Sequence, residues 1–210
     1  MLKYKARQNA LSEAIERWCV CEWWEGRLRV EIVYAYNVNT HKLSQISNDI
    51  QLNKLNFNDI YILKLYSPWN KYSVIIAFTK AIKSGVYIYA FAAAERFNTC
   101  LEKVFIELFR NQSVLDKYLF NHKADPLLQI GNIQDKSEKR LLYFASQEGF
   151  ESFFKRLVFS LKNNIKATQP KCILDLEVEG PWSNYTTVWR YLFAANSKLY
   201  LCDSADYFLF

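Results

Sequence analysis

The residues best suited to chemistry lie near the N-terminus, where Glu13 and Glu16 are three residues apart and Arg17 follows Glu13 by four. In a helix this spacing places them on one ridge, together with Asn9. Two neighbouring carboxylates can share a Mg²⁺ ion, which takes one or two carboxylates and completes its shell with water and phosphate oxygens. The spacing taken alone favours an ordinary solvated surface, with a Glu13–Arg17 ion pair worth about 0.3 kcal/mol.

A second predicted helix carries a similar polar ridge, formed by Thr99, Lys103, Glu107 and Arg110 and preceded by Glu95. A carboxylate of this ridge facing those of the first helix, with a cation nearby for phosphate charge, would form a nucleotide–magnesium pocket. The chain contains neither GxxxxGK[ST] nor GxGxxG. Such a pocket would therefore depend on helix-borne side chains instead of a phosphate-binding loop.

Hydrophobic periodicity predicts the elements that position these ridges. The predicted fold class is α+β, with mixed or antiparallel sheets and amphipathic helices packed on one face. We expect a single domain over residues 1–210, with a flexible segment at residues 122–140. Lys83, Ser84 and Gly85 indicate a hairpin turn. The predicted helices are 8–25, 97–110 and 149–165, and residues 112–121 either prolong the second helix or form a short separate one. The predicted strands are 28–36, 59–65, 73–82, 86–92, 172–178, 185–193 and 198–202. Residues 40–58 are mostly connection, residues 131–139 are a polar linker, and residues 141–144 are ambiguous.

Composition excludes a disordered chain and a membrane-spanning protein. Of 210 residues, 51% are hydrophobic and 17% aromatic, enough for a sizeable core. The longest uncharged apolar run, 86–94, has nine residues, whereas a membrane-spanning helix needs about 20. No secretory signal is visible at the N-terminus. The sequence thus predicts no membrane association.

The net charge of +6 is dispersed along the chain, which is typical of an ordinary protein surface and only weakly indicates a nucleic-acid partner. A basic α+β module that binds nucleic acid is the third functional hypothesis. In it, Trp23, Trp24 and Tyr36 beside Arg27 and Arg29 would stack on bases. Core packing of these aromatic residues is the favoured interpretation.

The five cysteines, Cys19, Cys21, Cys100, Cys172 and Cys202, form no CxxC pair. Their odd number argues against a complete disulfide framework, and with two histidines in the chain a zinc site is not expected. We interpret Cys19 and Cys21 as buried thiols of a protein in the reducing cytoplasm.

Four segments in order resemble the YcaO family. Residues 10–19 resemble its first helix motif, in which Ser, Glu and Glu-Arg correspond to Asn9, Glu13, Glu16 and Arg17. Residues 92–110 look like its second helix motif, with Glu107 on the first of two closing acids. Residues 172–177 and 187–193 are similar to its later strands, the last of which contains Arg190.

The resemblance implies a YcaO-like fold and an activity in the biosynthesis of ribosomally made modified peptides such as bacteriocins. Family members bind ATP and Mg²⁺ through glutamates on two helices. They phosphorylate a peptide backbone oxygen after nucleophilic attack, which yields azolines, thioamides or amidines. The resemblance implies that Glu13, Glu16 and Glu107 are metal ligands. It implies that ATP is bound by Asn9, Arg17, Glu107 and Arg190. The implied partners are a precursor peptide and another subunit of a modification complex.

The second motif departs from the family pattern. Arg110 occupies the position of the second closing acid, Asn111 that of the following Arg, and Thr99 that of an earlier acid. A cation cannot coordinate Mg²⁺, so a non-catalytic YcaO-like subunit that binds a peptide or a partner enzyme is the alternative function.

The resemblance also implies a chain truncated before the first motif. We therefore expect an exposed apolar patch, centred on the first helix and its neighbouring strand, that promotes homodimerisation or docking onto a partner subunit.

Overall fold

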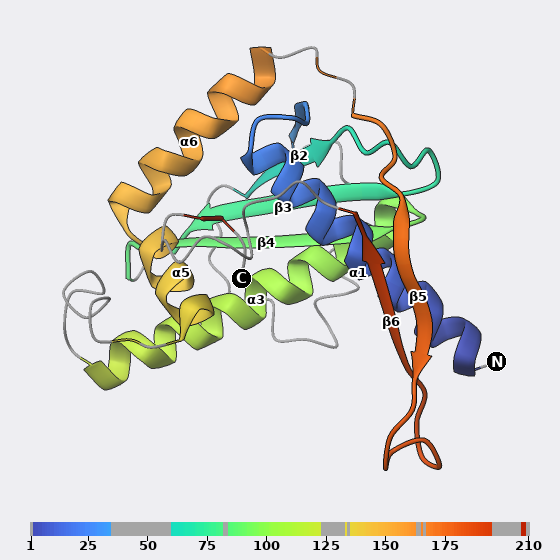
Figure 1. Ribbon diagram of the computed structural model, residues 1–210. Coiled ribbons are helices and arrows are strands. Elements are labelled where there is room, and N and C mark those ends of the chain that lie inside the picture. Colours follow the sequence, from blue (N-terminus) through green and yellow to red (C-terminus); the bar gives the residue numbers. More distant parts are fainter. Residues whose placement is uncertain are drawn as a thin grey trace.

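The computed structural model describes residues 2–34, 60–81, 84–122, 133, 135–162, 165, 167–194 and 207–208. Helices and antiparallel strands make up this part of the chain, so the predicted α+β class is confirmed. Figure 1 shows the elements, which in chain order are α1 (Leu2–Trp24), β1 (Val30–Tyr34), β2 (Tyr61–Leu65), β3 (Ser73–Lys80), β4 (Tyr87–Ala94), α3 (Phe97–His122), α5 (Lys136–Ala145), α6 (Gln147–Lys162), β5 (Cys172–Val178) and β6 (Val188–Phe193).

Four strands form one antiparallel sheet in the order β1-β2-β3-β4. Leu63 of β2 pairs with Ile76 of β3, and Phe78 of β3 pairs with Tyr89 of β4. The turn between β3 and β4 contains Gly85 at a φ of 70°, a conformation that glycine adopts readily and that the hairpin signal predicts. Because β4 ends the strand order, one side of its backbone has no neighbouring strand in the described sheet.

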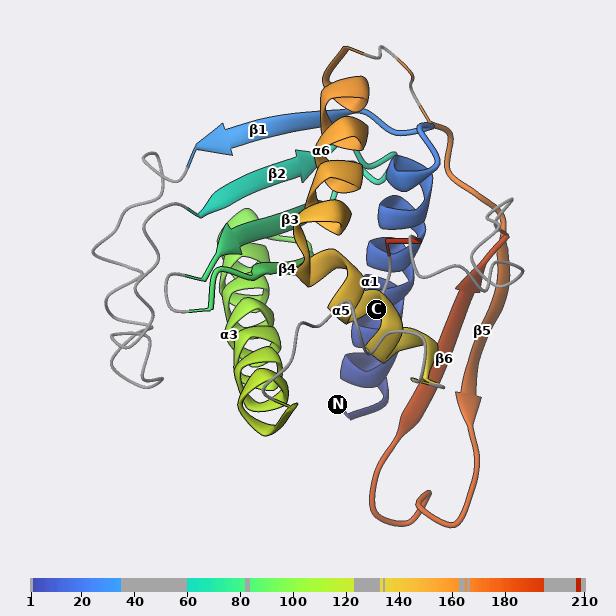
Figure 2. The same cartoon turned by 90° about the vertical axis from the view of Figure 1, so that its left-hand side faces the viewer.

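Helices cover both faces of this sheet. Side chains alternate along each strand, so Ile76 and Tyr89 pack into one core with α1 and α6, while Ile75 and Ala90 pack into a second core with α3. Figure 2 shows α1 and α3 on the two sides of the strands. The prediction of helices on one face is therefore wrong. The nearly continuous apolar sequence of β3 is that of a strand buried on both faces.

The hairpin formed by β5 and β6 lies along α1 (Figure 1). Arg7 donates from Nε to Asp175 Oδ1 over 2.9 Å, and Lys3 Nζ lies 2.8 Å from Glu177 Oε2. The hydrogen bond from Arg7 lowers the pKa of Asp175. These long-range ion pairs explain why α1 begins six residues before the predicted start at residue 8, because its first turns bury no apolar stripe, and Leu2 and Tyr4 there are exposed.

Aromatic rings fill the core between α1, β4, α5 and α6. Phe208 is fully buried, with ring centroids 4.9 to 5.7 Å from those of five neighbours: Trp23, Trp24, Tyr89, Phe144 and Phe153. Trp23 and Trp24 are themselves buried. They cannot stack on nucleic-acid bases, so the third hypothesis is wrong for these residues. Tyr36 lies outside the described residues.

The segment before α6 forms a helix that the sequence analysis does not predict. Residues 131–139 are predicted as a linker and 141–144 are ambiguous, but α5 begins at Lys136. Asp135 caps this helix by accepting a hydrogen bond from the backbone N–H of Glu138 over 2.9 Å. The Asp-x-x-Glu spacing of Asp135 and Glu138 is a helix-start signal that could have predicted α5.

Most other predicted elements are found with shifted ends. The second helix continues without a break to His122, and the helix predicted at 149–165 spans Gln147–Lys162. The strand predicted at 172–178 has the predicted bounds, whereas β6 begins three residues after the predicted start at 185. The predicted strand 198–202 and the connection 40–58 lie outside the described residues.

The described cysteines are free. Cys19 and Cys21 are buried, as predicted, and so is Cys100, whose pKa burial raises to about 12. A buried thiol of this kind stays protonated and unreactive. Across the described ranges, no helix is long and apolar enough to cross a bilayer.

Candidate functional site

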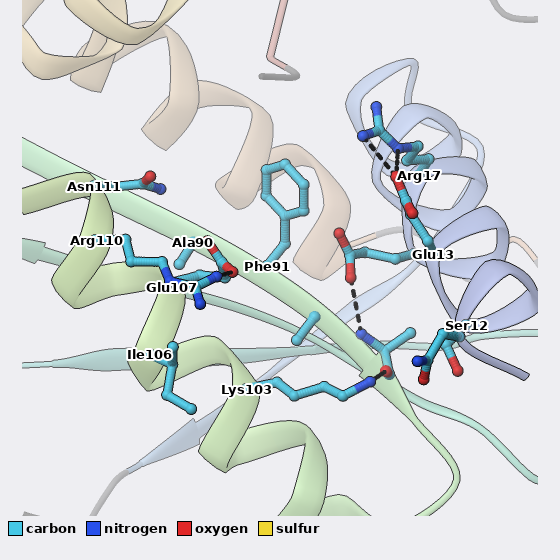
Figure 3. Close-up of a pocket in the computed structure, with 14 residues that line it drawn as sticks. Ser12, Glu13, Arg17, Ala90, Phe91, Lys103, Ile106, Glu107, Arg110 and Asn111 are labelled. Atoms are coloured by element: carbon cyan, nitrogen blue, oxygen red, sulfur yellow. Dashed lines mark hydrogen bonds and ion pairs between the residues drawn. The ribbon is translucent and has the colours of Figure 1, made fainter. Parts of the chain in front are cut away.

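A cavity of about 540 Å³ lies along the open edge of β4, between α1 and α3 (Figure 3). The two helices cover opposite faces of the sheet, yet both reach the cavity because β4 is the edge strand. Its lining residues are Asn9, Ser12, Glu13, Glu16 and Arg17 from α1, Ala90, Phe91, Ala92 and Ala93 from β4, and Lys103, Ile106, Glu107, Arg110 and Asn111 from α3.

Side chains from both helices satisfy polar backbone groups of the strand edge. Glu16 Oε2 accepts a hydrogen bond from the N–H of Ala93 over 3.2 Å, and Lys103 Nζ donates to the carbonyl of Ala93 over 3.5 Å. Asn111 donates from Nδ2 to the carbonyl of Tyr89 over 2.7 Å. Figure 3 shows Lys103 extending from α3 to the strand. These bonds fix both helices to β4 and define the walls of the cavity.

The cavity contains three acids and three bases, and two ion pairs join four of them. Arg17 Nη2 lies 2.9 Å from Glu13 Oε1, which confirms the predicted pair on α1. Arg110 Nη1 lies 2.5 Å from Glu107 Oε1. Glu16 and Lys103 are the remaining acid and base.

Glu16 is half-buried, and its burial raises the pKa of the carboxyl to about 8. The neighbouring Arg17 and Lys103 oppose this increase, while Glu13 adds to it. The Glu16 carboxyl is therefore largely protonated at neutral pH. A cation that binds it must displace this proton, so cation binding to the cavity should strengthen as the pH rises toward 8.

We expect Glu16→Gln to change how stability depends on pH. The carboxyl pKa rises from its ordinary value of 4.5 to about 8 on folding. The native state therefore binds more protons between these values, and the parent loses stability as the pH rises through that window. Gln keeps an acceptor oxygen for Ala93 but cannot ionise. After allowance for partial exposure, the variant should gain about 1–3 kcal/mol over the parent between pH 4.5 and 8.

Urea unfolding at several pH values measures this gain. Glu102→Gln removes an exposed carboxylate of α3 outside the cavity and controls for the loss of one charge. A stability difference between Glu16→Gln and the parent that stays constant from pH 4.5 to 8 would contradict the prediction.

Most of the predicted site residues line this one cavity. Asn9, Glu13, Glu16 and Arg17 reach it from α1, and Glu107 from α3. Arg190 does not line it: this exposed residue lies on β6, in the hairpin beside α1.

Several lining features carry no clear signal in the sequence. Ser12 and the edge of β4 are not predicted as parts of a site, because strand order determines which strand lies at the edge. Asn111 is noted in the sequence only as a departure from a motif. Its spacing of four from Glu107 places both on one face of α3 and could have indicated a shared site.

The three glutamates proposed as metal ligands share the cavity without forming a compact cluster. Among the described residues, no group of three or more His, Cys, Asp or Glu side chains is placed to hold a metal ion. Comparison of the chain with family models, with curated proteins and with solved structures finds no match.

Proposed function

We propose that the cavity between α1 and α3 binds ATP with Mg²⁺, and that the protein is a YcaO-like enzyme that activates a backbone amide of a precursor peptide. One observation carries the proposal: the two segments that resemble the YcaO helix motifs line the same cavity, with Glu13, Glu16 and Arg17 on one wall and Glu107 on the other. The proposed setting is a peptide-modification complex in the cytoplasm.

The chemical types of the residues that line the cavity suit ATP with Mg²⁺. Carboxylates of Glu13, Glu16 and Glu107 are ligands that Mg²⁺ accepts, and Arg17 and Lys103 can neutralise phosphate charge. A volume of about 540 Å³ falls within the usual range for small-molecule sites. Bound ATP would supply a phosphoryl group that turns the amide oxygen into a good leaving group, while the cations stabilise the developing charge.

A non-catalytic YcaO-like subunit is the second candidate function, and the Glu107–Arg110 ion pair favours it. Arg110 stands where the family motif has an acid, and it neutralises the one carboxylate that α3 contributes to the cavity. In this case the protein would bind a peptide or a partner enzyme without using ATP.

Titration calorimetry with ATP and Mg²⁺ tests the proposal. We expect the isolated chain to bind Mg·ATP with a Kd weaker than about 0.1 mM, because Arg110 competes with the metal for Glu107. The variant Arg110→Glu removes this competition and adds a carboxylate, so it should bind about tenfold more tightly. The double variant Glu13→Gln, Glu16→Gln should lose the Mg²⁺ dependence of any binding.

The control Glu102→Gln should bind as the parent does. A low-micromolar Kd for the parent would mean that our interpretation of the second motif is wrong. Failure of both the parent and Arg110→Glu to bind at millimolar Mg·ATP would contradict the nucleotide site and leave the non-catalytic function as the better account.

A further inference from the structure

The outer surface of α6 carries an apolar stripe formed by Phe154, Val158 and Leu161, residues that are 50%, 37% and 37% exposed. Exposed Ile165 continues it beyond the helix end. The inner surface of the same helix, with Phe153, is already buried in the core. A single surface helix needs one apolar face, and α6 has two adjacent ones.

This location corrects the prediction of an apolar patch on the first helix. Ile15, Trp18 and Trp23 of α1 are buried, in a core that also contains side chains of α6 and Phe208. Exposed apolar residues also occur on α1 (Leu2, Tyr4) and α3 (Val114, Phe120), but those of α6 follow one another at helical spacing along one face.

We propose that α6 of one chain pairs with α6 of a second copy in antiparallel orientation through this stripe. The stripe residues follow one another at intervals of four and three, the spacing of a helix–helix seam. Charge favours a second copy as the occupant: exposed Glu148 and Glu151 lie near the start of α6, while exposed Lys155 and Lys162 lie further along it. An antiparallel pair sets the acidic end of each helix toward the basic end of the other.

Helix geometry makes this complementarity specific. Glu151 and Lys162 are eleven residues apart, close to three full turns, so both lie on the same flank of the stripe. With a two-fold axis near Val158, Glu151 lies roughly 10 Å from the axis, and Lys162 of the second copy lies roughly 6 Å from it on the same side. Long side chains span this difference, and symmetry forms the contact twice. In a parallel pair the two-fold axis would run along the helices and place Glu151 and Lys162 of the two copies on opposite sides of the seam, so these contacts would not form.

The pairing is independent of the proposed nucleotide site, because no residue of α6 lines the cavity. A negative result for dimer formation would therefore leave the proposed function unaffected. A negative result for nucleotide binding would likewise leave the α6 pairing unaffected.

Light scattering of the chain at tens of micromolar tests the interface. We expect a dimer for the parent and a monomer for Val158→Glu, with dimer affinity at least about 100-fold weaker, since a charge would be buried at the centre of the seam. Val114→Glu places the same charge at an exposed valine of α3 and should remain dimeric. A monomeric parent, or a dimeric Val158→Glu, would overturn the proposal.

Charge reversal tests the antiparallel orientation. Glu151→Lys and Lys162→Glu should each weaken the dimer about tenfold, because each creates two like-charge contacts. The double variant exchanges both charges and should recover the parent affinity within about threefold. Failure of the double variant to recover would overturn the antiparallel pairing. These surface substitutions leave the buried face of α6 unchanged, so misfolding does not obscure the result.

Discussion

Phe208→Ala should destabilise the protein by about 3–5 kcal/mol, the range for removing a buried aromatic side chain from a close-packed core. Phe208 is fully buried and its ring contacts rings of α1, β4, α5 and α6. No single element can move to fill the space, because each is fixed by contacts with the others. The loss would be a large part of the 5–15 kcal/mol that stabilises a typical domain.

Urea unfolding followed by circular dichroism measures the change in the free energy of unfolding. Phe120→Ala is the matched control, because Phe120 lies on α3 with its side chain 83% exposed, and we expect a change within about 0.5 kcal/mol. A loss below about 1 kcal/mol for Phe208→Ala would mean that the aromatic core does not depend on this residue.

The elements with strong periodicity were predictable from the sequence, but their arrangement was not. The apolar stripe of α3 and the alternation of β5 are local patterns, and both elements were predicted close to their observed positions. The apolar sequence of β3 indicates burial on both faces, but which helix covers which face is a long-range property. The first turns of α1 likewise depend on partners about 170 positions away, Asp175 and Glu177.

The helix side chains of the candidate site were predictable because helical spacing alone brings Glu13, Glu16 and Arg17 together. The role of the β4 edge was not, since the sequence gives no indication that this strand ends the sheet. Arg190 illustrates the same limit: it was included through the resemblance of its strand, and that strand belongs to a hairpin that does not reach the cavity. Binding of ATP and Mg²⁺ stays a prediction.

Gly149→Ala should also destabilise the protein strongly, because the corner between α5 and α6 leaves no room for a side chain. A Cβ at this position would lie 2.1 Å from the carbonyl oxygen of Tyr143 and 2.6 Å from the Cα of Phe144. Both are backbone atoms and cannot rotate away. The Ser146 hydroxyl stabilises this corner with two hydrogen bonds. It accepts one from the backbone N–H of Gly149 over 3.1 Å and donates one to the backbone carbonyl of Tyr143 over 2.6 Å.

The extra methyl group must therefore push α6 away from α5 and withdraw Phe153 from the aromatic core. We expect a loss of about 3 kcal/mol, the upper end for overpacking. Helix propensity alone predicts the opposite sign, a gain of about 1 kcal/mol for Ala over Gly. The sign measured by urea unfolding thus distinguishes the two effects. Gly85→Ala is the comparison variant: its Cβ would meet nothing within 4 Å, and only the positive φ should cost about 1 kcal/mol. A stabilised Gly149→Ala would show that α5 and α6 are not in close backbone contact.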